Sequence, residues 1–247
     1  MPFLSFRDVE CQRSGRVVLD RLSFDLDEGE TLVLLGRSGS GKTSAIQVIV
    51  RLLEFQRGEI EFEGRDLRSL DVIALRRRIG YVIQEIGLLP HWTVAQNVAL
   101  VPKLLEWNSE RIEARVRELL DQVQLPYGQY AGRMPHQLSG GQRQRVGVAR
   151  ALAANPALLL FDEPFGALDP LTRLDMQQQF LALRERYSIP AIFVTHDVTE
   201  ALKLGTRIAV LDGGRLETIA ERRQFLHTNT PVARAFLETL PSRQGVN

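Results

Sequence analysis

The sequence predicts an α/β fold with a mostly parallel sheet, an antiparallel β subdomain near the N-terminus and an inserted helical subdomain. Short apolar runs typical of buried strands alternate with helical periodicity on both sides of the middle segment. That segment, about 87–155, shows helical spacing without such runs. The chain has 247 residues, of which 44% are hydrophobic and 25% charged, so one domain with a sizeable core is expected over 1–240.

The N-terminal third contains four expected strands. Alternation of apolar and polar residues over 22–26 and 59–64 predicts strands with one exposed face. Continuous apolar runs over 31–36 and 79–84 predict buried strands, as parallel sheets require. A glycine-rich loop follows 31–36 and leads to an expected helix, whose buried face carries Ile46, Ile49, Val50 and Leu53. Together with 156–220, the segment 1–86 is expected to form the α/β core.

In the middle segment Ser109 is expected to cap one helix, and a second helix is expected after the glycines at 140–141. Apolar runs at 157–161, 191–195 and 207–211 then predict further parallel strands joined by helices. The tail, about 221–247, is expected to form one or two short helices, with Pro231 in a first turn.

Bulk composition excludes several classes of protein. A formal net charge of +1 provides no field that would attract nucleic acid, and the run 76–78 of arginines is better explained as a solvated helical face. The single cysteine, Cys11, excludes an internal disulfide and is expected to be a small buried or half-buried apolar residue. The N-terminus lacks a signal peptide, and no run approaches the roughly 18 apolar residues of a membrane helix. A cytoplasmic location is therefore expected.

The first glycine-rich loop has the spacing of a phosphate-binding motif. It fits G-x-x-x-x-G-K-[ST] between an expected strand and an expected helix, with Gly36, Arg37, Ser38, Gly39, Ser40, Gly41, Lys42 and Thr43, followed by Ser44. Glycines let backbone N–H groups surround phosphate oxygens, and the helix N-terminus adds partial positive charge. Lys42 is expected to reach the β- and γ-phosphates, and Thr43 to ligate Mg²⁺. A chance glycine turn is the alternative, and the strand–loop–helix context argues against it.

Polar side chains also follow three of the expected buried strands. Asp162 and Glu163 follow one strand, where Asp162 could organise Mg²⁺ and Glu163 could orient and deprotonate an attacking water. The alternative is a strand end whose acids are merely solvated.

His196 follows the strand at 191–195 and could hydrogen-bond a γ-phosphate, although a lone histidine there is as often structural. Gln84 could reach Mg²⁺ or the attacking water, or could simply be exposed.

This ordered set resembles the ATP-binding-cassette (ABC) ATPases over about 3–240. The phosphate loop resembles their Walker A motif, and 158–163 resembles Walker B with its catalytic glutamate. Gln84 matches the Q-loop and His196 the switch histidine, while 138–142 (LSGGQ) matches the signature and 167–169 the D-loop. The resemblance implies a P-loop NTPase core, ATP hydrolysis, and ATP with Mg²⁺ at the site.

The resemblance also explains why the chain carries two glycine-rich loops. In this family two subunits pack head to tail, and the signature of one closes on the γ-phosphate held by the Walker A loop of the other. Ser139 and Gly141 would then donate hydrogen bonds in trans, with Gly140, Gln142 and Asp169 at the same composite site. A second copy of the chain is thus an expected partner.

The stretch 76–107 resembles the osmoprotectant branch of bacterial importers, whose substrates include glycine betaine, choline and carnitine. The resemblance implies a motor subunit on the inner face of the cell membrane that binds no nucleic acid. Its partners would be two transmembrane permease subunits and, indirectly, a secreted substrate-binding protein. The open alternatives are an importer for another small solute such as ergothioneine or an amino acid, and a soluble ABC ATPase without a transport role. A P-loop kinase would instead need a phosphate acceptor and leaves LSGGQ without a role.

Two further segments have implied roles. The segment 84–102 would receive coupling helices of the permease subunits through an apolar patch. The alternative is that these side chains fill the core of the helical subdomain. The apolar residues are Ile86, Leu88, Leu89, Trp92 and Val94.

Upstream of Walker A, members of this family usually have an aromatic residue that stacks on adenine. Here the matching position is Arg13, or Ser14 beside it, and a planar guanidinium can stack on a base.

Overall fold

The computed structural model describes residues 1–84 and 87–240, which form two compact units. One unit consists of Met1–Val72 with Ser188–Asn247, and the other is Ile73–Tyr187. Ile86 and the end of the expected helical tail, 241–247, lie outside the described residues. No helix within the described ranges is long and apolar enough to cross a bilayer.

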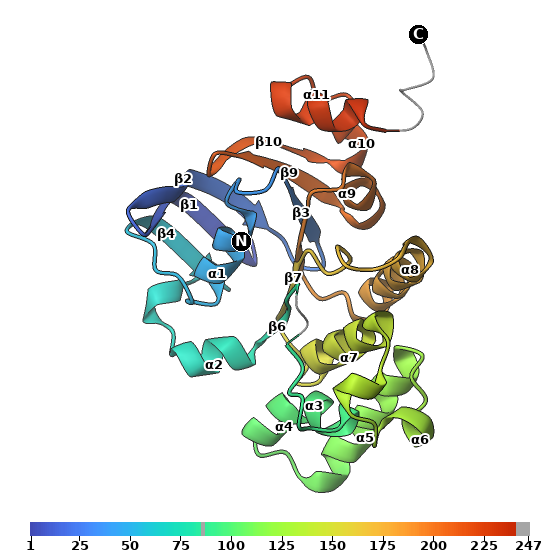
Figure 1. The fold of residues 1–247 in the computed structure, drawn as a ribbon. Helices are drawn as coiled ribbons and strands as arrows, with labels where there is room; N and C mark the ends of the chain where they lie inside the picture. Colours follow the sequence, from blue (N-terminus) through green and yellow to red (C-terminus); the bar gives the residue numbers. More distant parts are fainter. Residues whose placement is uncertain (85–86, 241–247) are drawn as a thin grey trace. The chain divides into compact units, whose positions relative to one another are not determined.

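The first unit contains the expected antiparallel sheet (Figure 1). Its strand order is β2-β1-β4-β5, from β1 (Leu4–Arg13), β2 (Arg16–Leu26), β4 (Arg57–Phe62) and β5 (Arg65–Asp66). The hairpin between β1 and β2 turns through Ser14 and Gly15, whose φ angles of 51° and 77° are those of a tight type I′ turn. Cys11 is buried in this sheet, as expected from the sequence.

A second sheet in the same unit carries the phosphate loop. Strand β3 (Thr31–Leu35) pairs in parallel with β8 (Ala191–Thr195) and β9 (Arg207–Asp212), while β10 (Arg215–Glu221) is antiparallel to β9. Every residue of β3 and β8 is buried, which is the pattern of a strand covered on both faces. The helices of the unit are α1 (Lys42–Ile49), η1 (Leu67–Ser69), α9 (Val198–Leu204), α10 (Arg222–Phe225) and α11 (Pro231–Glu238), and α2 (Val72–Arg77) begins at the boundary.

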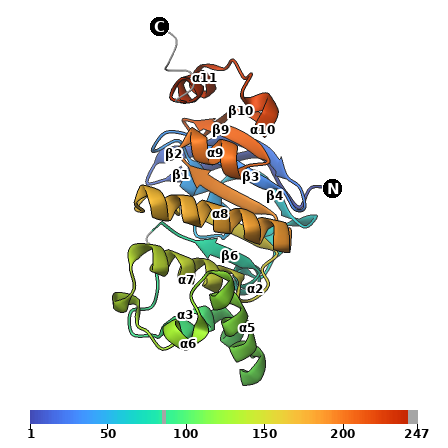
Figure 2. The same cartoon turned by 90° about the vertical axis from the view of Figure 1, so that its right-hand side faces the viewer.

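The second unit is mostly helical and contains one strand pair. Strand β6 (Ile79–Val82) runs parallel to β7 (Leu158–Asp162). The helices are α3 (Val94–Val98), α4 (Leu100–Leu104), α5 (Ser109–Gln122), α6 (Tyr127–Tyr130), η2 (Pro135–Gln137), α7 (Gly140–Leu152) and α8 (Pro170–Tyr187). Helix α7 contacts α3, α5, α8 and β6, so it forms the centre of this unit (Figure 2).

The expected strands and the α/β class are confirmed, and three local expectations are wrong. The helix after the phosphate loop ends at Ile49, because Arg51 adopts a left-handed conformation (φ 52°), so Leu53 lies outside it. The cap of α5 is Asn108, whose Oδ1 accepts a hydrogen bond from the Arg111 N–H at 2.8 Å, whereas Ser109 is the first helical residue. Helix α7 already begins at Gly140. The expected subdomain boundaries at 87–155 stay a prediction.

Candidate functional site

The phosphate loop connects β3 to α1, and glycine is required at several of its positions. Gly41 has a φ of 101°, and a Cβ on it would lie 2.6 Å from the carbonyl oxygen of Val18. A side chain there would therefore clash with β2 as well as strain the backbone. Gly39 also has positive φ (80°), but a Cβ on it would meet nothing within 4 Å. The loop thus packs on one side against the antiparallel sheet and is open at Gly39.

Lys42 lies at the start of α1 and folds back over this loop. Its side chain is buried, and its Nζ donates hydrogen bonds to the carbonyl oxygens of Gly36 and Arg37, both at 2.8 Å. These two hydrogen bonds hold the loop around the ammonium group of Lys42. The buried hydroxyl of Ser40 has no hydrogen-bond partner. An unpaired buried hydroxyl beside a buried ammonium and a helix N-terminus fits an incoming anion such as phosphate.

The parallel register places His196 next to the phosphate loop within the first unit. Leu35, the last residue of β3, is paired with Thr195, the last residue of β8. Gly36 and His196 therefore leave adjacent strands at the same edge of the sheet. His196 is exposed, and buried Thr195 donates a hydrogen bond to Glu200 at 2.6 Å and accepts one from the Asp197 N–H at 3.0 Å. These bonds hold the backbone on both sides of the histidine.

Within the second unit, strand pairing places Asp162 and Glu163 at the same sheet edge as Gln84. Val82 of β6 pairs with Phe161 of β7. Asp162, the last residue of β7, and Glu163 after it therefore lie at the same edge of this strand pair as Gln84, which follows β6. Asp162 is buried, whereas Glu163 is partly exposed and Gln84 is exposed. Tyr81, which no sequence motif indicates, also belongs to this group: its hydroxyl donates a hydrogen bond to Oδ2 of Asp162 at 3.3 Å.

The backbone at Glu163 is unusual. Its φ is 45°, a left-handed conformation that a non-glycine residue seldom adopts and that is often found at functional sites. Chain direction changes there, directly after the buried strand β7. Burial and the neighbouring Asp162 carboxylate raise the pKa of the Tyr81 phenol, so this hydroxyl keeps its proton at neutral pH.

The signature residues form the beginning of α7. Ser139 is its N-cap: the Ser139 Oγ accepts a hydrogen bond from the Gln142 N–H, while the Gln142 side chain accepts one from the Ser139 N–H. This capping box leaves the Ser139 hydroxyl proton to donate elsewhere. A Cβ on Gly141 would collide with Thr172 of α8, whereas Gly140 is open apart from a distant Arg143 atom. The second glycine is thus required by packing, and the first borders free space.

A cavity of about 620 Å³ brings three of the expected motifs together within this unit. Its described lining includes the Q-loop, signature helix and D-loop residues Gln84, Gly140, Gln144, Ala167 and Leu168. Asp169, at the end of the D-loop, is exposed and accepts a hydrogen bond from the Thr172 N–H at 3.1 Å. Hydrogen bonds from the Thr172 side chain and N–H lower the pKa of Asp169, so this carboxylate is ionised at neutral pH.

Comparison with known proteins decides the family. The ABC transporter family model matches residues 19–166. A solved dimeric structure of the ATP-binding cassette MJ0796, in a post-hydrolysis state with ADP and Pi, is 32% identical, covers 89% of this chain and 99% of that chain, and superposes with a TM-score of 0.79. The chain belongs to the ABC transporter family.

Relatives of this ABC chain include ATP-binding proteins of transport systems. It is 46% identical over 214 residues to the glycine betaine/carnitine/choline transport ATP-binding protein OpuCA of Bacillus subtilis, covering 87% of this chain and 56% of OpuCA. It is 47% identical over 213 residues to the glycine betaine uptake system ATP-binding protein YehX of Escherichia coli, covering 86% of this chain and 69% of YehX. The ABC chain therefore spans little more than half the length of OpuCA.

The segment after the Q-loop in this ABC chain is divided between surface and core. Leu89 is 37% exposed and Leu88 and Trp92 are partly exposed, whereas Val94 is fully buried. Asn97, which no sequence motif indicates, is fully buried and holds this segment by hydrogen bonds. Its side-chain amide donates to the carbonyl oxygens of Leu89, Trp92 and Thr93 and accepts from the Leu89 N–H. A role of the exposed part in docking permease helices stays a prediction.

Arg13 of the ABC chain lies at the tip of the β1–β2 hairpin. It is exposed and paired across the turn with Arg16, which is also exposed. The same β2 strand passes beside the phosphate loop at Val18. The position thus suits contact with a base, and stacking of the guanidinium there stays a prediction.

If Arg13 stacks on adenine, Arg13→Tyr should lower the apparent KM for ATP and Arg13→Ala should raise it. Stacking on an aromatic side chain is worth about 1–3 kcal/mol per base, or about five- to a hundredfold in affinity. We expect the unmodified chain to have modest ATP affinity and to discriminate poorly between ATP and GTP. Steady-state hydrolysis with both nucleotides checks this, with Arg16→Ala as the matched control. Strong ATP preference that survives in Arg13→Ala would show that another residue holds the base.

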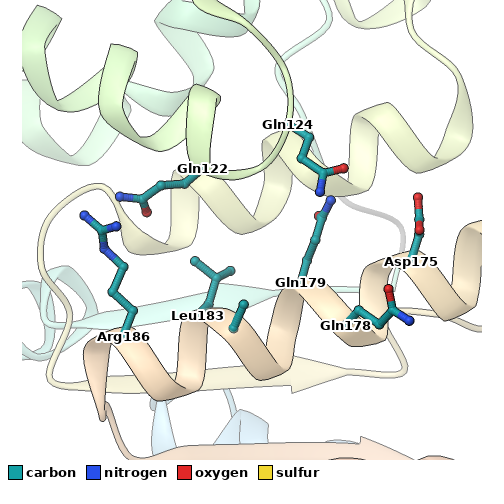
Figure 3. A pocket seen from close by; sticks show the side chains of 8 residues that line it. Gln122, Gln124, Asp175, Gln178, Gln179, Leu183 and Arg186 are labelled. Atoms are coloured by element: carbon teal, nitrogen blue, oxygen red, sulfur yellow. The ribbon is translucent and has the colours of Figure 1, made fainter.

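A second hollow, of about 360 Å³, lies between the end of α5 and helix α8 (Figure 3). Two of its glutamines, Gln122 and Gln124, take part in hydrogen bonds that join neighbouring helices. Gln122 donates to Glu118 at 2.8 Å and accepts from the Tyr187 hydroxyl at 2.7 Å. Arg145 pairs with Asp175 at 3.1 Å and donates to Gln124 at 2.8 Å. This hollow is accounted for by packing between the helices of the ABC chain, and it contains none of the expected site residues.

Proposed function

We propose that this chain hydrolyses ATP as the motor subunit of an ABC importer for quaternary-amine osmoprotectants. The observation that carries the proposal is the phosphate loop, whose buried Lys42 and unpaired Ser40 hydroxyl are prepared for an anion beside His196. The end of β7 supports it independently, because a buried and a partly exposed carboxylate adjoin there. Family membership and the transport names of OpuCA and YehX point to the same function.

In this proposal each polar group has a defined role. Walker A residues and the α1 N-terminus hold the phosphates, with Lys42 exchanging its loop carbonyls for β- and γ-phosphate oxygens. Glu163 orients a water for attack on the γ-phosphorus and accepts its proton, while His196 donates a hydrogen bond to the γ-phosphate. Bond cleavage between the β–γ bridging oxygen and the γ-phosphorus leaves ADP and inorganic phosphate.

The residues assigned to Mg²⁺ fit that ion chemically. Thr43, Gln84 and Asp162 offer a hydroxyl, an amide oxygen and a carboxylate, and Mg²⁺ prefers oxygen ligands. No group of three or more His, Cys, Asp or Glu side chains in metal-binding geometry occurs within residues 1–84 and 87–240. One carboxylate with phosphate and water oxygens is the usual arrangement for Mg²⁺ in nucleotide sites. When bound, the ion would neutralise charge on the phosphates.

Transport follows from assembly in this proposal. Two copies of the chain would pack head to tail around two ATP molecules, with Ser139 and Gly141 of one copy contacting the nucleotide of the other. Dimeric structures of MJ0796 support such assembly. Two permease subunits would receive the exposed part of the segment after Gln84 and hold the motor at the inner face of the membrane. A secreted binding protein would deliver the solute to the permease.

Two measurements test the proposal. Purified protein with ATP and Mg²⁺ should release phosphate with no acceptor added, which a P-loop kinase would not do. Cells that carry the gene, compared with cells that lack it, should take up labelled glycine betaine, choline or carnitine faster at high osmolarity. If the protein releases phosphate but the cells do not take up these solutes faster, the ATPase function stands and the proposed substrate class is wrong. Labelled amino acids are then the next substrates to test.

A further inference from the structure

Tyr81 reaches Asp162 across two neighbouring parallel strands. On β6 it pairs with Leu160 of β7, so Asp162 lies two residues further along β7 and on the same face of the sheet. Strand β6 ends at Val82, before it would come level with Asp162. Only a long side chain can cover this diagonal distance, and the tyrosine hydroxyl does so, at 3.3 Å from Oδ2. The contact therefore follows from strand register rather than from sequence proximity.

The chemistry of this contact suits a carboxylate that must retain its charge. Asp162 is only 8% exposed, and a buried carboxylate is costly unless hydrogen bonds compensate it. An arginine or lysine in place of Tyr81 would also compensate the carboxylate, but its positive charge would compete with a bound cation. A phenol donates a hydrogen bond and remains neutral. It can thus restrict rotation of the carboxylate about its Cβ–Cγ bond without reducing the attraction for a metal ion.

We propose that Tyr81 is a positioning residue that orients the Asp162 carboxylate for the magnesium ion of the bound nucleotide. The proposal rests on the assignment of Asp162 under the proposed function. With Oδ2 held by the phenol, rotation of the carboxylate is restricted, so the group keeps one orientation. Groups that orient metal ligands in this way typically contribute about 10- to 100-fold to metal affinity. Because the hydrogen bond is long, we expect the lower end of that range.

The test measures how much Mg²⁺ strengthens nucleotide binding. Affinity for a non-hydrolysable ATP analogue is determined by calorimetry in Mg²⁺ and in EDTA, and the ratio of the two gives the metal contribution. Tyr81→Phe removes only the hydroxyl, and it should reduce this ratio about tenfold while leaving affinity in EDTA unchanged. A tyrosine with a purely structural role would, when changed, alter unfolding or affinity in both conditions but leave the ratio unchanged.

Two further variants make the result decisive. Tyr187→Phe is the matched control, because it removes a phenol hydroxyl that bonds Gln122 in the same unit, and it should keep the ratio. Asp162→Asn should abolish most of the metal contribution. If Tyr81→Phe keeps the wild-type ratio while Asp162→Asn loses it, the role of Tyr81 is wrong and that of Asp162 stands. If both variants keep the ratio, the Asp162 assignment itself is wrong, and the inference about Tyr81 is overturned with it.

Discussion

Glu163→Gln is expected to lower ATP turnover by about two to four powers of ten while ATP binding is retained. Glutamine has nearly the same shape as glutamate and can occupy the same left-handed backbone conformation (φ 45°) after β7. The substitution therefore removes the carboxylate's ability to accept a proton while keeping the size and shape of the side chain. Because the uncleaved γ-phosphate would continue to join two copies of the chain, the variant should accumulate as an ATP-bound dimer.

Phosphate release measures the first effect, and size-exclusion chromatography in ATP and Mg²⁺ measures the second. Glu185→Gln is a suitable control, since it removes an exposed carboxylate from α8, away from the expected site residues. This control should hydrolyse ATP at the wild-type rate and should not accumulate as a dimer. Wild-type turnover in Glu163→Gln would refute the assignment of the catalytic base.

Ser139→Arg and Lys42→Ala are each expected to abolish hydrolysis when prepared alone, and their mixture is expected to recover part of it. Arginine at Ser139 would fill the open space beside Gly140, which the γ-phosphate of the partner's nucleotide would occupy in the proposed dimer. Lys42→Ala removes the ammonium group from the chain's own phosphate loop. A mixed dimer contains one composite site in which both the lysine and the signature are intact, so activity can return there if one site suffices.

Loss of the helix cap must be separated from the trans effect. Substitution of a capping serine destabilises a helix by about 1 kcal/mol, so Ser139→Arg affects α7 as well as the interface. Ser139→Ala removes the same cap without filling the space, and it should retain more activity in the same assay. The trans arrangement would be contradicted by a structure of the ATP-bound dimer in which LSGGQ contacts the nucleotide of its own chain.

Local patterns in the sequence determined the strands, the class of the fold and the order of the motifs. Buried parallel strands consist of short apolar runs, because both of their faces are covered. This pattern correctly predicted β3, β7, β8 and β9. The glycine spacing from Gly36 to Lys42 predicted the turn between β3 and α1, since few other residues permit such a backbone. These features depend on neighbours in the chain, which a sequence displays directly.

Helix ends were harder to predict, because several neighbouring residues can cap a helix or terminate it. Asn108 and Ser109 are both good caps, and only the backbone at that point decides that the Asn108 side chain reaches the Arg111 N–H. Helical spacing continues as far as Leu53, but the left-handed conformation of Arg51 ends the regular hydrogen bonding earlier. Periodicity alone carries no information about that reversal.

Contacts between distant segments were decided only by the tertiary structure. The pairing of β6 with β7 brings Tyr81 to Asp162, which lie 81 positions apart in the chain. The packing of α7 against α8 requires the absence of a side chain at Gly141, because Thr172 occupies that space. Strand register and helix packing arise from the simultaneous burial of many side chains. No short stretch of sequence can therefore specify which hydroxyl meets which carboxylate, or which glycine is packed and which is open.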